Sequence, residues 1–213
     1  MAVHYKKLVL ETSDEVYHPA EDSFLLADSV KAGWGRVLDV GTGTGIQALN
    51  AARYAEHAAG VDLNPAAVEL AKRNAKANGI RNAEFWVSDL FSEVNGRFDL
   101  IVFNPPYLET EAENMLERAW AGGKLGVEVI NRFIDEAGGH LLPEGRIMLL
   151  ISSINRLEEV MKRFEKNGYN AEIAARQKIF FEELYVLTAW RKRRTSAQGI
   201  LQPAGIWEKP TNP

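Results

Sequence analysis

Cysteine is absent from this chain of 213 residues, and histidine occurs only four times. The absence of cysteine excludes disulfides, cysteine-based zinc sites and a thiol nucleophile. The four histidines lack the spacing of metal ligands, so we expect chemistry that needs no metal ion held by the protein. No apolar run reaches the roughly 18 residues that span a membrane, and no charged-then-apolar leader opens the chain. We therefore expect a cytoplasmic protein that has no membrane partner.

A basic balance is missing too, because the formal net charge at pH 7 is −4. Proteins that bind a phosphate backbone usually carry a basic face, so nucleic acid is not the expected substrate. The local exception is the run Arg191–Arg194, for which a solvated charged segment is the simpler interpretation and RNA contact the alternative. One domain with a full hydrophobic core accounts for the length. We assign residues 1–190 to this domain and residues 191–213 to a basic, flexible tail.

Short apolar runs alternate with amphipathic segments along the chain. The pattern predicts strands at Val37–Val40, Ala58–Asp62, Ala83–Val87, Phe98–Phe103, Arg146–Ile151, Asn170–Ala175 and Leu184–Trp190. It predicts helices at Ala20–Lys31, Ile46–Tyr54, Pro65–Ala77, Lys124–Gly138 and Leu157–Asn167. Strands that alternate with helices form right-handed βαβ units, which place helices on both faces of a mostly parallel sheet. The expected fold class is therefore doubly wound α/β, whose ligands bind beyond the carboxyl ends of the strands.

A glycine-rich turn, Asp39–Gly45, follows the first of these strands directly and opens a helix. Glycines without a Cβ let the backbone approach a ligand closely, and a helix N-terminus offers free N–H groups to a carboxylate or phosphate. Gly41, Gly43 and Gly45 have the spacing Gly-x-Gly-x-Gly, which differs from the dinucleotide-binding Gly-x-Gly-x-x-Gly. No Gly-Lys-Ser/Thr follows, which disfavours a nucleoside triphosphate site. An ordinary turn is the alternative interpretation of the glycines alone.

Acidic residues follow the next two predicted strands. Asp62 lies about 20 residues past the glycine-rich turn, the separation at which a carboxylate accepts hydrogen bonds from a ribose hydroxyl pair. The alternative role for Asp62 is to balance the dipole of the following helix. Asp89 lies just past the third strand, where it can accept from an adenine amino group while Leu90 and Phe91 pack against the ring. A turn-forming aspartate is the alternative interpretation of Asp89.

The most specific signal is Asn104-Pro105-Pro106-Tyr107, which begins where the strand Phe98–Phe103 ends. The two prolines remove two backbone donors and stiffen the loop, so the Asn104 side-chain oxygen and the Pro105 carbonyl oxygen can be held as acceptors. Two such acceptors suit an NH₂ group, and Tyr107 offers a face on which a planar amide or amino group packs. These four residues form the predicted catalytic loop, and a rigid turn without a catalytic role is the alternative.

Several stretches together resemble the HemK-type protein glutamine N5-methyltransferases, which modify the Gly-Gly-Gln motif of peptide-chain release factors. The resemblance runs through most of Val16–Leu187 and is most specific in Val16–Leu26, Asp39–Gly45, Val61–Pro65, Asn104–Tyr107 and Ala119–Gly123. The first and last of these stretches are similar to the short archaeal and eukaryotic branch of the family. Two departures are mild, since this chain has His18-Pro19 and Ser23 where the branch often has Glu-Pro and Thr. A larger departure is the tail after Trp190, where similar proteins tend to stop soon. The resemblance implies a class I methyltransferase fold, with a seven-stranded, mostly parallel sheet and an antiparallel last strand.

The resemblance also implies that the cofactor is S-adenosylmethionine. The residues implied to line it are Ser23, Asp39, Gly41, Gly43, Asp62, Leu63 and Asp89, to which we add Tyr17, Gly45, Leu90 and Asn104. Asn104 and Pro105 are implied to hold the glutamine amide. The expected reaction is an in-line displacement that moves the sulfonium methyl group to the amide nitrogen. A strong general base is not required, because the proton can leave after the methyl group has been transferred.

Members of this branch work with a small zinc-binding activator protein, and we expect such a partner here. In a class I sheet the strand Ala83–Val87 is an edge, and Phe85 and Trp86 are large apolar groups on an element that normally needs protection. A strand of the partner can pair with this edge and cover it. The alternative is that helices of the same chain bury both side chains.

Three other functions stay open at this point. An adenine-N6 methyltransferase shares the Asn-Pro-Pro-Tyr motif, but it needs a recognition domain or a basic cleft for a flipped base. A protein lysine methyltransferase must first deprotonate the amine, and the sequence shows no dedicated base for that step. An inactive cofactor-binding scaffold would have no need of the intact loop at residues 104–107.

Overall fold

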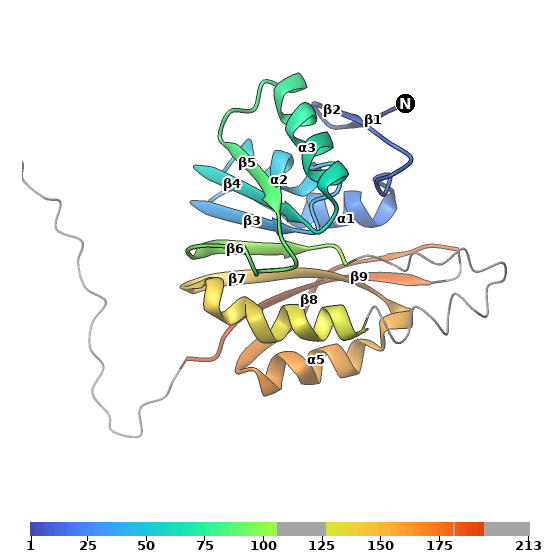
Figure 1. Cartoon of the computed structure of the whole chain (residues 1–213). Coiled ribbons are helices and arrows are strands. Elements are labelled where there is room, and N and C mark those ends of the chain that lie inside the picture. The colour runs from blue at the N-terminus through green and yellow to red at the C-terminus, as the bar shows by residue number, and fades with distance from the viewer. Residues whose placement is uncertain (106–126, 181, 194–213) are drawn as a thin grey trace, which may run out of the picture.

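A seven-stranded sheet organises the chain in the computed structural model, which describes residues 1–105, 127–180 and 182–193 (Figure 1). Its strand order is β5-β4-β3-β6-β7-β9-β8. The strands are β3 (Arg36–Val40), β4 (His57–Asp62), β5 (Ala83–Val87), β6 (Phe98–Phe103), β7 (Leu141–Ser152), β8 (Tyr169–Lys178) and β9 (Glu183–Arg191), and a separate hairpin is made by β1 (Ala2–Tyr5) and β2 (Leu8–Glu11). Among the described strands of the sheet, β9 alone is reversed, pairing antiparallel with β7 and β8. The predicted fold class, including the antiparallel last strand, is confirmed.

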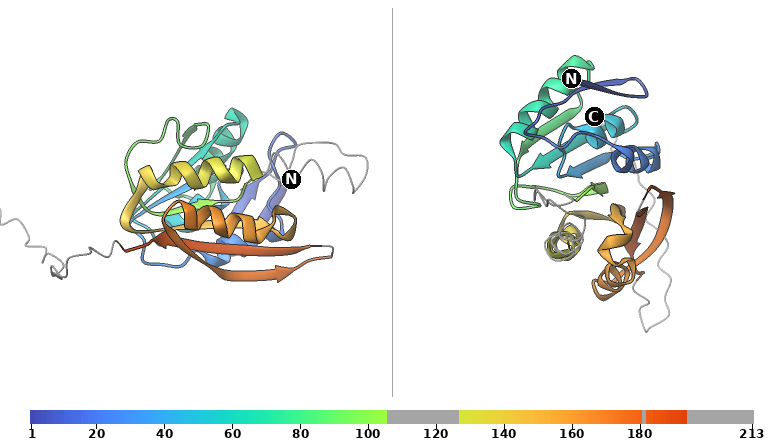
Figure 2. Two further views of the ribbon diagram at one scale, coloured as in Figure 1. Left: turned by 90° about the horizontal axis from the view of Figure 1, so that it is seen from below. Right: turned by 90° about the vertical axis from the view of Figure 1, so that its right-hand side faces the viewer.

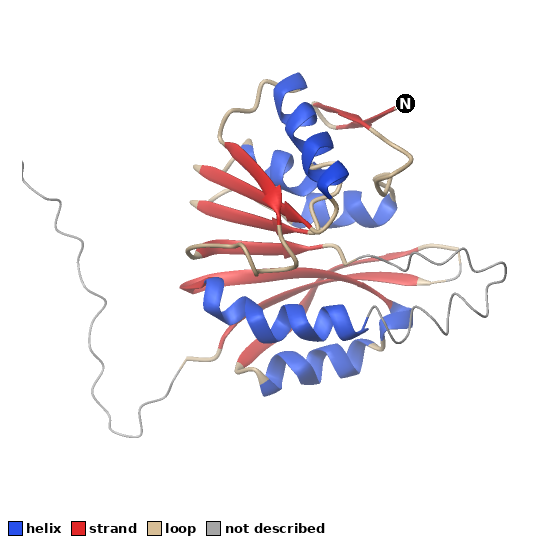
Figure 3. Cartoon of the chain, in the orientation of Figure 1, coloured by secondary structure: helices blue, strands red, loops and turns tan. Residues whose placement is uncertain are grey.

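Helices cover both faces of this sheet (Figures 1, 2 and 3). They are α1 (Glu21–Ser29), α2 (Ile46–Ala52), α3 (Pro65–Ala77), α5 (Leu157–Lys166) and a helix over residues 127–137, with 3₁₀ turns η1 (Gly138–His140) and η2 (Ser153–Asn155). Helices α1 to α3 lie on one face, and α5 with the helix over 127–137 lies on the other (Figure 3). Along β3, Val37 packs in the cluster that includes Leu26 of α1, while Leu38 packs with Phe133 on the opposite face. Burial on both faces explains why the strands read as continuous apolar runs.

Helix α3 has the bounds that the sequence predicts, because both of its ends carry specific signals. The side-chain oxygen of Asn64 accepts a hydrogen bond from the Ala66 N–H at 2.9 Å, and Pro65 occupies the first helical turn. Gly79, with φ +66°, follows the C-terminal end. The helix thus starts directly beyond the carboxyl end of β4, next to the predicted site.

The hairpin of β1 and β2 is absent from the predicted elements. Asn74 of α3 and Asn78, which directly follows this helix, hold the hairpin in place. Asn74 accepts from the Glu11 N–H at 2.8 Å and donates to the Glu11 carbonyl at 3.1 Å. Asn78 makes the same pair of bonds with Val9, at 2.9 and 2.8 Å. The two side chains therefore satisfy backbone groups of β2 that a neighbouring strand would otherwise bond. The apolar periodicity of a four-residue strand does not predict such contacts.

Strand β5 lies at one edge of the sheet, as predicted. Phe85 is buried with side chains of α2 and α3, so the alternative of burial within the chain is correct for this residue. Trp86 is half-buried, and its indole N–H donates to the Glu93 carbonyl at 3.1 Å. Val87 remains 43% exposed at the end of the strand. The free edge of β5 therefore exposes mainly backbone groups and the Val87 side chain, and little aromatic surface.

Several element ends differ from their predicted positions. Strand β7 begins at Leu141 and not at Arg146, because Leu141 already pairs with Phe98. The register then shifts before the next pair, Leu100 with Arg146. Helix α1 ends at Ser29 and not at Lys31. The helix predicted to begin at residue 124 is helical over 127–137, and its first residues lie outside the described ranges. No helix in the described ranges is long and apolar enough to cross a membrane.

Candidate active site

The glycine-rich turn between β3 and α2 places its backbone in conformations that side chains disfavour. Gly41 and Gly43 have φ values of +66° and +53°. A Cβ on Gly41 would lie 3.2 Å from the ring of Phe103, so the turn is packed directly against the end of β6. Gly45, at φ +87°, faces α3 instead, where a Cβ would lie 3.1 Å from that of Ala71. Two of the three glycines thus shape the site, and the third lets two helices approach.

Asp62 ends β4 and ties this turn to the start of α3. One carboxylate oxygen accepts from the Gly43 N–H at 2.9 Å, and the other accepts from the Asn64 N–H at 2.9 Å. Burial raises the pKa of Asp62, and these backbone hydrogen bonds oppose the rise. Each carboxylate oxygen has lone-pair capacity beyond one bond. The held carboxylate is therefore placed to accept two further hydrogen bonds from a diol.

Asp39, at the start of the glycine-rich turn, is hydrogen-bonded to Thr42 within the turn and to Ala48 in α2. One of its oxygens accepts from the Thr42 hydroxyl at 2.7 Å and from the Ala48 N–H at 3.1 Å. The other oxygen has no hydrogen-bond partner in the described part of the chain. Burial raises the pKa of Asp39 to about 7, against the lowering effect of the bonds from Thr42 and Ala48. The carboxyl group is thus poised to change charge near neutral pH.

Asn104 directly follows the last residue of β6, and the two ends of its side-chain amide differ in their contacts. Its Nδ2 donates to the Asp22 carboxylate at 3.0 Å and to the Ser23 hydroxyl at 3.4 Å. Its Oδ1 is buried without a partner among the described residues. Pro105 is buried beside it, while Pro106 and Tyr107 of the predicted catalytic loop lie outside the described residues.

These groups meet in a cavity of about 210 Å³ beyond the carboxyl ends of β3, β4 and β6. Of the predicted site residues, those that line the cavity are Tyr17, Ser23, Gly41, Gly43, Asp62, Asn104 and Pro105. Thr44 Oγ1 and Gln47 Oε1, like the Asn104 oxygen, are buried there without a partner in the described ranges. Since buried polar atoms are normally hydrogen-bonded, the cavity suits a ligand that carries several polar groups.

The remaining predicted site residues lie outside this cavity. They are Asp39, Gly45, Leu63, Asp89 and Leu90, and Asp39 is hydrogen-bonded to the lining residue Thr42. The Asp89 carboxylate accepts from Arg132 at 3.0 Å in an exposed ion pair, and Leu63 is 68% exposed. Leu90 is buried and has φ +48°. Cofactor contacts by Leu63, Asp89 and Leu90 stay predictions.

Two lining residues, Asp22 and Gln47, were not singled out by the sequence analysis. Gln47 donates to the Ser23 carbonyl at 2.8 Å and so ties α2 to α1. Asp22 receives the Asn104 amide from a segment 82 positions away in the chain. A buried polar residue on an otherwise apolar helix face is the signal that was available for both.

The strand order, the reversed β9 and the cavity at the carboxyl ends of the central strands define a class I methyltransferase. S-adenosylmethionine fits this cavity, because two glycines line it, the Asp62 carboxylate has spare acceptor capacity, and the buried oxygens of Thr44 and Gln47 have no partner among the described residues. The chain belongs to the methyltransferase small domain family, whose model matches residues 20–180, and within it to the HemK-type protein N5-glutamine methyltransferases. It is an S-adenosylmethionine-dependent enzyme.

Two relatives and one solved structure illustrate the membership. A protein of Methanocaldococcus jannaschii named "Putative protein N5-glutamine methyltransferase" is 42% identical over 197 residues, which cover 90% of this chain and 100% of the relative. The methyltransferase HEMK2 of Mus musculus is 34% identical over 189 residues, which cover 81% of this chain and 88% of the relative. A chain of the E. cuniculi Mtq2–Trm112 complex, described as responsible for methylating the eRF1 translation termination factor, is 30% identical with a TM-score of 0.65. The match covers 84% of this chain and 99% of that one.

Proposed function

We propose that the enzyme methylates the side-chain amide nitrogen of a glutamine in the Gly-Gly-Gln motif of a translation release factor, in the cytoplasm. The observation that carries the proposal is the buried Oδ1 of Asn104 at the end of β6, which has no hydrogen-bond partner among the residues that the structure describes. An acceptor in this position suits a substrate NH₂ group. The Mtq2–Trm112 complex, described as acting on a termination factor, supports the choice of a release factor.

The residues of this chain orient the acceptor amide and leave the chemistry to the bound partners. S-adenosylmethionine would be held by cavity residues that include Gly41, Gly43 and Asp62, and it would supply an electrophilic methyl group to the amide nitrogen, with the electron pair of the former C–S bond left on sulfur. Asn104 Oδ1 accepts one substrate N–H, and the Pro105 carbonyl is the proposed second acceptor. As positive charge builds on nitrogen, these dipoles stabilise it, and the surplus N–H proton then leaves to water.

Orientation is the larger energetic contribution. Holding both reactants in line can lower the barrier by as much as roughly 7–11 kcal/mol. One preorganised hydrogen-bonding group aimed at developing charge contributes about 3 kcal/mol more. An amide nitrogen is a weak nucleophile because its lone pair is delocalised, so it depends on both contributions.

Mass spectrometry of the methylated product tests the proposal. A release-factor domain with Gly-Gly-Gln, the same domain with Gly-Gly-Asn, an adenine-containing oligonucleotide and a lysine-rich protein are each incubated with enzyme and isotopically labelled cofactor. We expect the label on the glutamine side chain of the first substrate. Label on adenine or lysine, with none on glutamine, refutes the assignment.

Asn104→Ala tests the residue that carries the proposal. We expect kcat to fall by about 100-fold or more, because one preorganised acceptor is lost. The cofactor Kd should change less than about threefold, since the Asn104 oxygen is assigned to the substrate and the other lining residues keep their contacts with the cofactor. Asn170→Ala on the exposed surface of β8 is the matched control. Equal losses in kcat and cofactor affinity contradict the role.

A second proposal concerns a partner protein at the edge of the sheet. We propose that a small zinc-binding protein of the Trm112 type pairs a strand with β5. Asn82 and Ser88, at either side of β5, are bonded to β4 at 2.9 Å each, so residues of even number turn their backbone groups inward. The residues whose N–H and C=O groups face the free edge are therefore Ala83, Phe85 and Val87.

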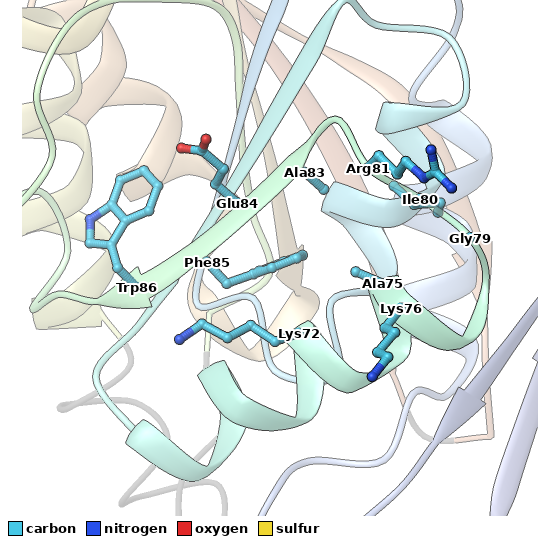
Figure 4. A pocket seen from close by; sticks show the side chains of 10 residues that line it. All are labelled: Lys72, Ala75, Lys76, Gly79, Ile80, Arg81, Ala83, Glu84, Phe85 and Trp86. Carbon is cyan, nitrogen blue, oxygen red and sulfur yellow. The ribbon is translucent and has the colours of Figure 1, made fainter.

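A groove beside this edge supports the proposal (Figure 4). It has a volume of about 720 Å³ and lies between α3 and β5. Lys72, Lys76 and Arg81 line it against a single acidic residue, Glu84. The excess of positive charge favours an acidic segment in the partner.

Val87→Pro tests the pairing without disturbing the sheet. Proline at this position removes an outward N–H and none of the bonds to β4. We expect the variant to keep the Tm of the wild type within a few degrees and to lose binding to a Trm112-type protein by at least about tenfold. Val87→Thr, which keeps the N–H, should bind normally. Unchanged binding by the proline variant refutes pairing at this edge.

A further inference from the structure

Asp22 is a buried carboxylate in the first turn of α1 that the reaction described above does not use. It is 5% exposed, and four hydrogen bonds converge on it. One oxygen accepts from the Ser23 N–H at 2.6 Å, the Ser23 hydroxyl at 3.2 Å and the Tyr17 hydroxyl at 3.2 Å. The other oxygen accepts from Asn104 Nδ2 at 3.0 Å. No Lys or Arg of the described residues forms an ion pair with Asp22. Uncharged N–H and O–H donors therefore hold this carboxylate in place.

The carboxamide of Asn104 has nearly the same shape when its oxygen and nitrogen are exchanged by a half-turn. A carboxylate can only accept, so Asp22 selects the orientation in which Nδ2 faces it. The Ser23 hydroxyl, which already donates to Asp22, accepts a second, longer bond from the same Nδ2 at 3.4 Å. In consequence Oδ1 points away from both residues and is left buried without a described partner.

We propose that Asp22, braced by Tyr17 and Ser23, is a positioning residue that keeps the oxygen of Asn104 turned toward the substrate NH₂ group. The inference rests on the proposed function, because an NH₂ acceptor is what makes the orientation matter. With the opposite orientation, the amide NH₂ of Asn104 would meet the substrate NH₂ donor to donor. Asn104 alone therefore does not fix the orientation of its own side-chain amide, and Asp22 of α1 determines which end faces the substrate.

Asp22→Asn is the first test. The Ser23 N–H cannot turn round, so the new side chain must keep its oxygen there and turn its NH₂ toward Asn104. Asn104 then reverses and presents its own NH₂ to the substrate. We expect kcat to fall by about 100-fold, the loss that follows removal of one preorganised group, while the cofactor Kd changes by less than about threefold. The enzyme is assayed on the Gly-Gly-Gln domain, with a Trm112-type partner present throughout.

The exchange variant Asp22→Asn with Asn104→Asp is the second test. Asn104→Asp alone places two carboxylates face to face and should be nearly inactive. In the double variant, Asn at 22 donates to Asp at 104, whose other oxygen again faces the substrate. We expect the double variant to be at least about tenfold more active than either single variant. A carboxylate that only stabilised the fold would give losses that accumulate.

Tyr17→Phe provides a milder variant that keeps the fold. It removes one of the braces on Asp22, and we expect kcat to fall about three- to tenfold. Thermal unfolding and the ¹⁵N–¹H signals of the Asn104 side chain are measured for each variant. The Asn104 signals should be protected from solvent exchange in the wild type and shifted in Asp22→Asn.

The outcomes separate the two proposals. A wild-type enzyme that leaves the Gly-Gly-Gln domain unmethylated refutes the proposed function. An active wild type with an equally active Asp22→Asn variant refutes the role of Asp22, as does a folded double variant that is no better than either single variant. Parallel losses of kcat and cofactor affinity in Asp22→Asn also refute it, because they indicate a general disturbance of the site.

Discussion

Replacing Asp39 by asparagine tests how the protonation of this buried carboxyl group affects the free energy of unfolding. Asp39 is 1% exposed, and burial raises its pKa to about 7, while an aspartate in an unfolded chain titrates near ~4. The folded state therefore binds the proton more tightly than the unfolded state. The stabilising contribution is complete below about pH 4 and is lost as the pH rises toward 7.

The magnitude follows from the difference between the two pKa values. Each pH unit between them is worth about 1.4 kcal/mol. Between pH 5 and pH 8 the wild type should lose about 2–3 kcal/mol of stability through this group. Asparagine does not titrate, and its amide can keep the acceptor bonds from Thr42 and Ala48. Plotted against pH, the difference in unfolding free energy between Asp39→Asn and the wild type should therefore rise by the same amount.

Urea denaturation of the cofactor-free proteins at several pH values measures this difference. A constant difference from pH 5 to pH 8 would show that Asp39 keeps an ordinary pKa and would refute the reasoning. Calorimetric titration of S-adenosylmethionine supplies the functional counterpart. Because the cofactor is cationic, we expect the variant to bind it more weakly than the wild type at pH 8, with a smaller deficit at pH 5.5.

Two further predictions address the frame around the site. Gly60→Ala should destabilise the protein by about 1–3 kcal/mol, because a Cβ would lie 2.6 Å from Phe85 and from the Thr42 hydroxyl. Thermal unfolding checks this, and a wild-type Tm contradicts the packing. Asn74→Ala should cost about 2–3 kcal/mol, since it removes three hydrogen bonds to backbone groups of β2 and the glycine-rich turn. Hydrogen exchange should then become faster in β1 and β2 than in the central strands, and uniform exchange would show that the hairpin is held otherwise.

The architecture was predictable where a physical pattern is local. Apolar runs bounded by turn residues located the strands of the sheet, and the capping pair Asn64-Pro65 fixed the start of α3. The glycine-rich turn, Asp62 and Asn104 were predicted at strand ends, and the parallel sheet brings them to one cavity. Local sequence patterns, together with the rule that ligands bind beyond the carboxyl ends of parallel strands, were sufficient to predict the sheet and these site residues.

The rest depends on contacts between distant segments. The hairpin of β1 and β2 is held by Asn74 and Asn78, whose partners lie more than 60 positions away. The burial of Phe85 follows from the packing of α2 and α3 on β5, which the edge position alone does not reveal. Neither contact has a signature in the strand itself, because each depends on which helix face is turned toward it.

Asn104 shows how the two kinds of information combine in one function. The motif specifies a carboxamide at the end of β6, but a carboxamide is ambiguous by a half-turn, and nothing within the loop resolves the ambiguity. The acceptor-only carboxylate of Asp22 resolves it from 82 positions away. An aspartate at position 104 would offer an oxygen in either orientation, but the carboxylate of Asp22 would repel it. The asparagine and its distant carboxylate therefore form one functional unit, and the activity of the exchange variant measures whether they act as one.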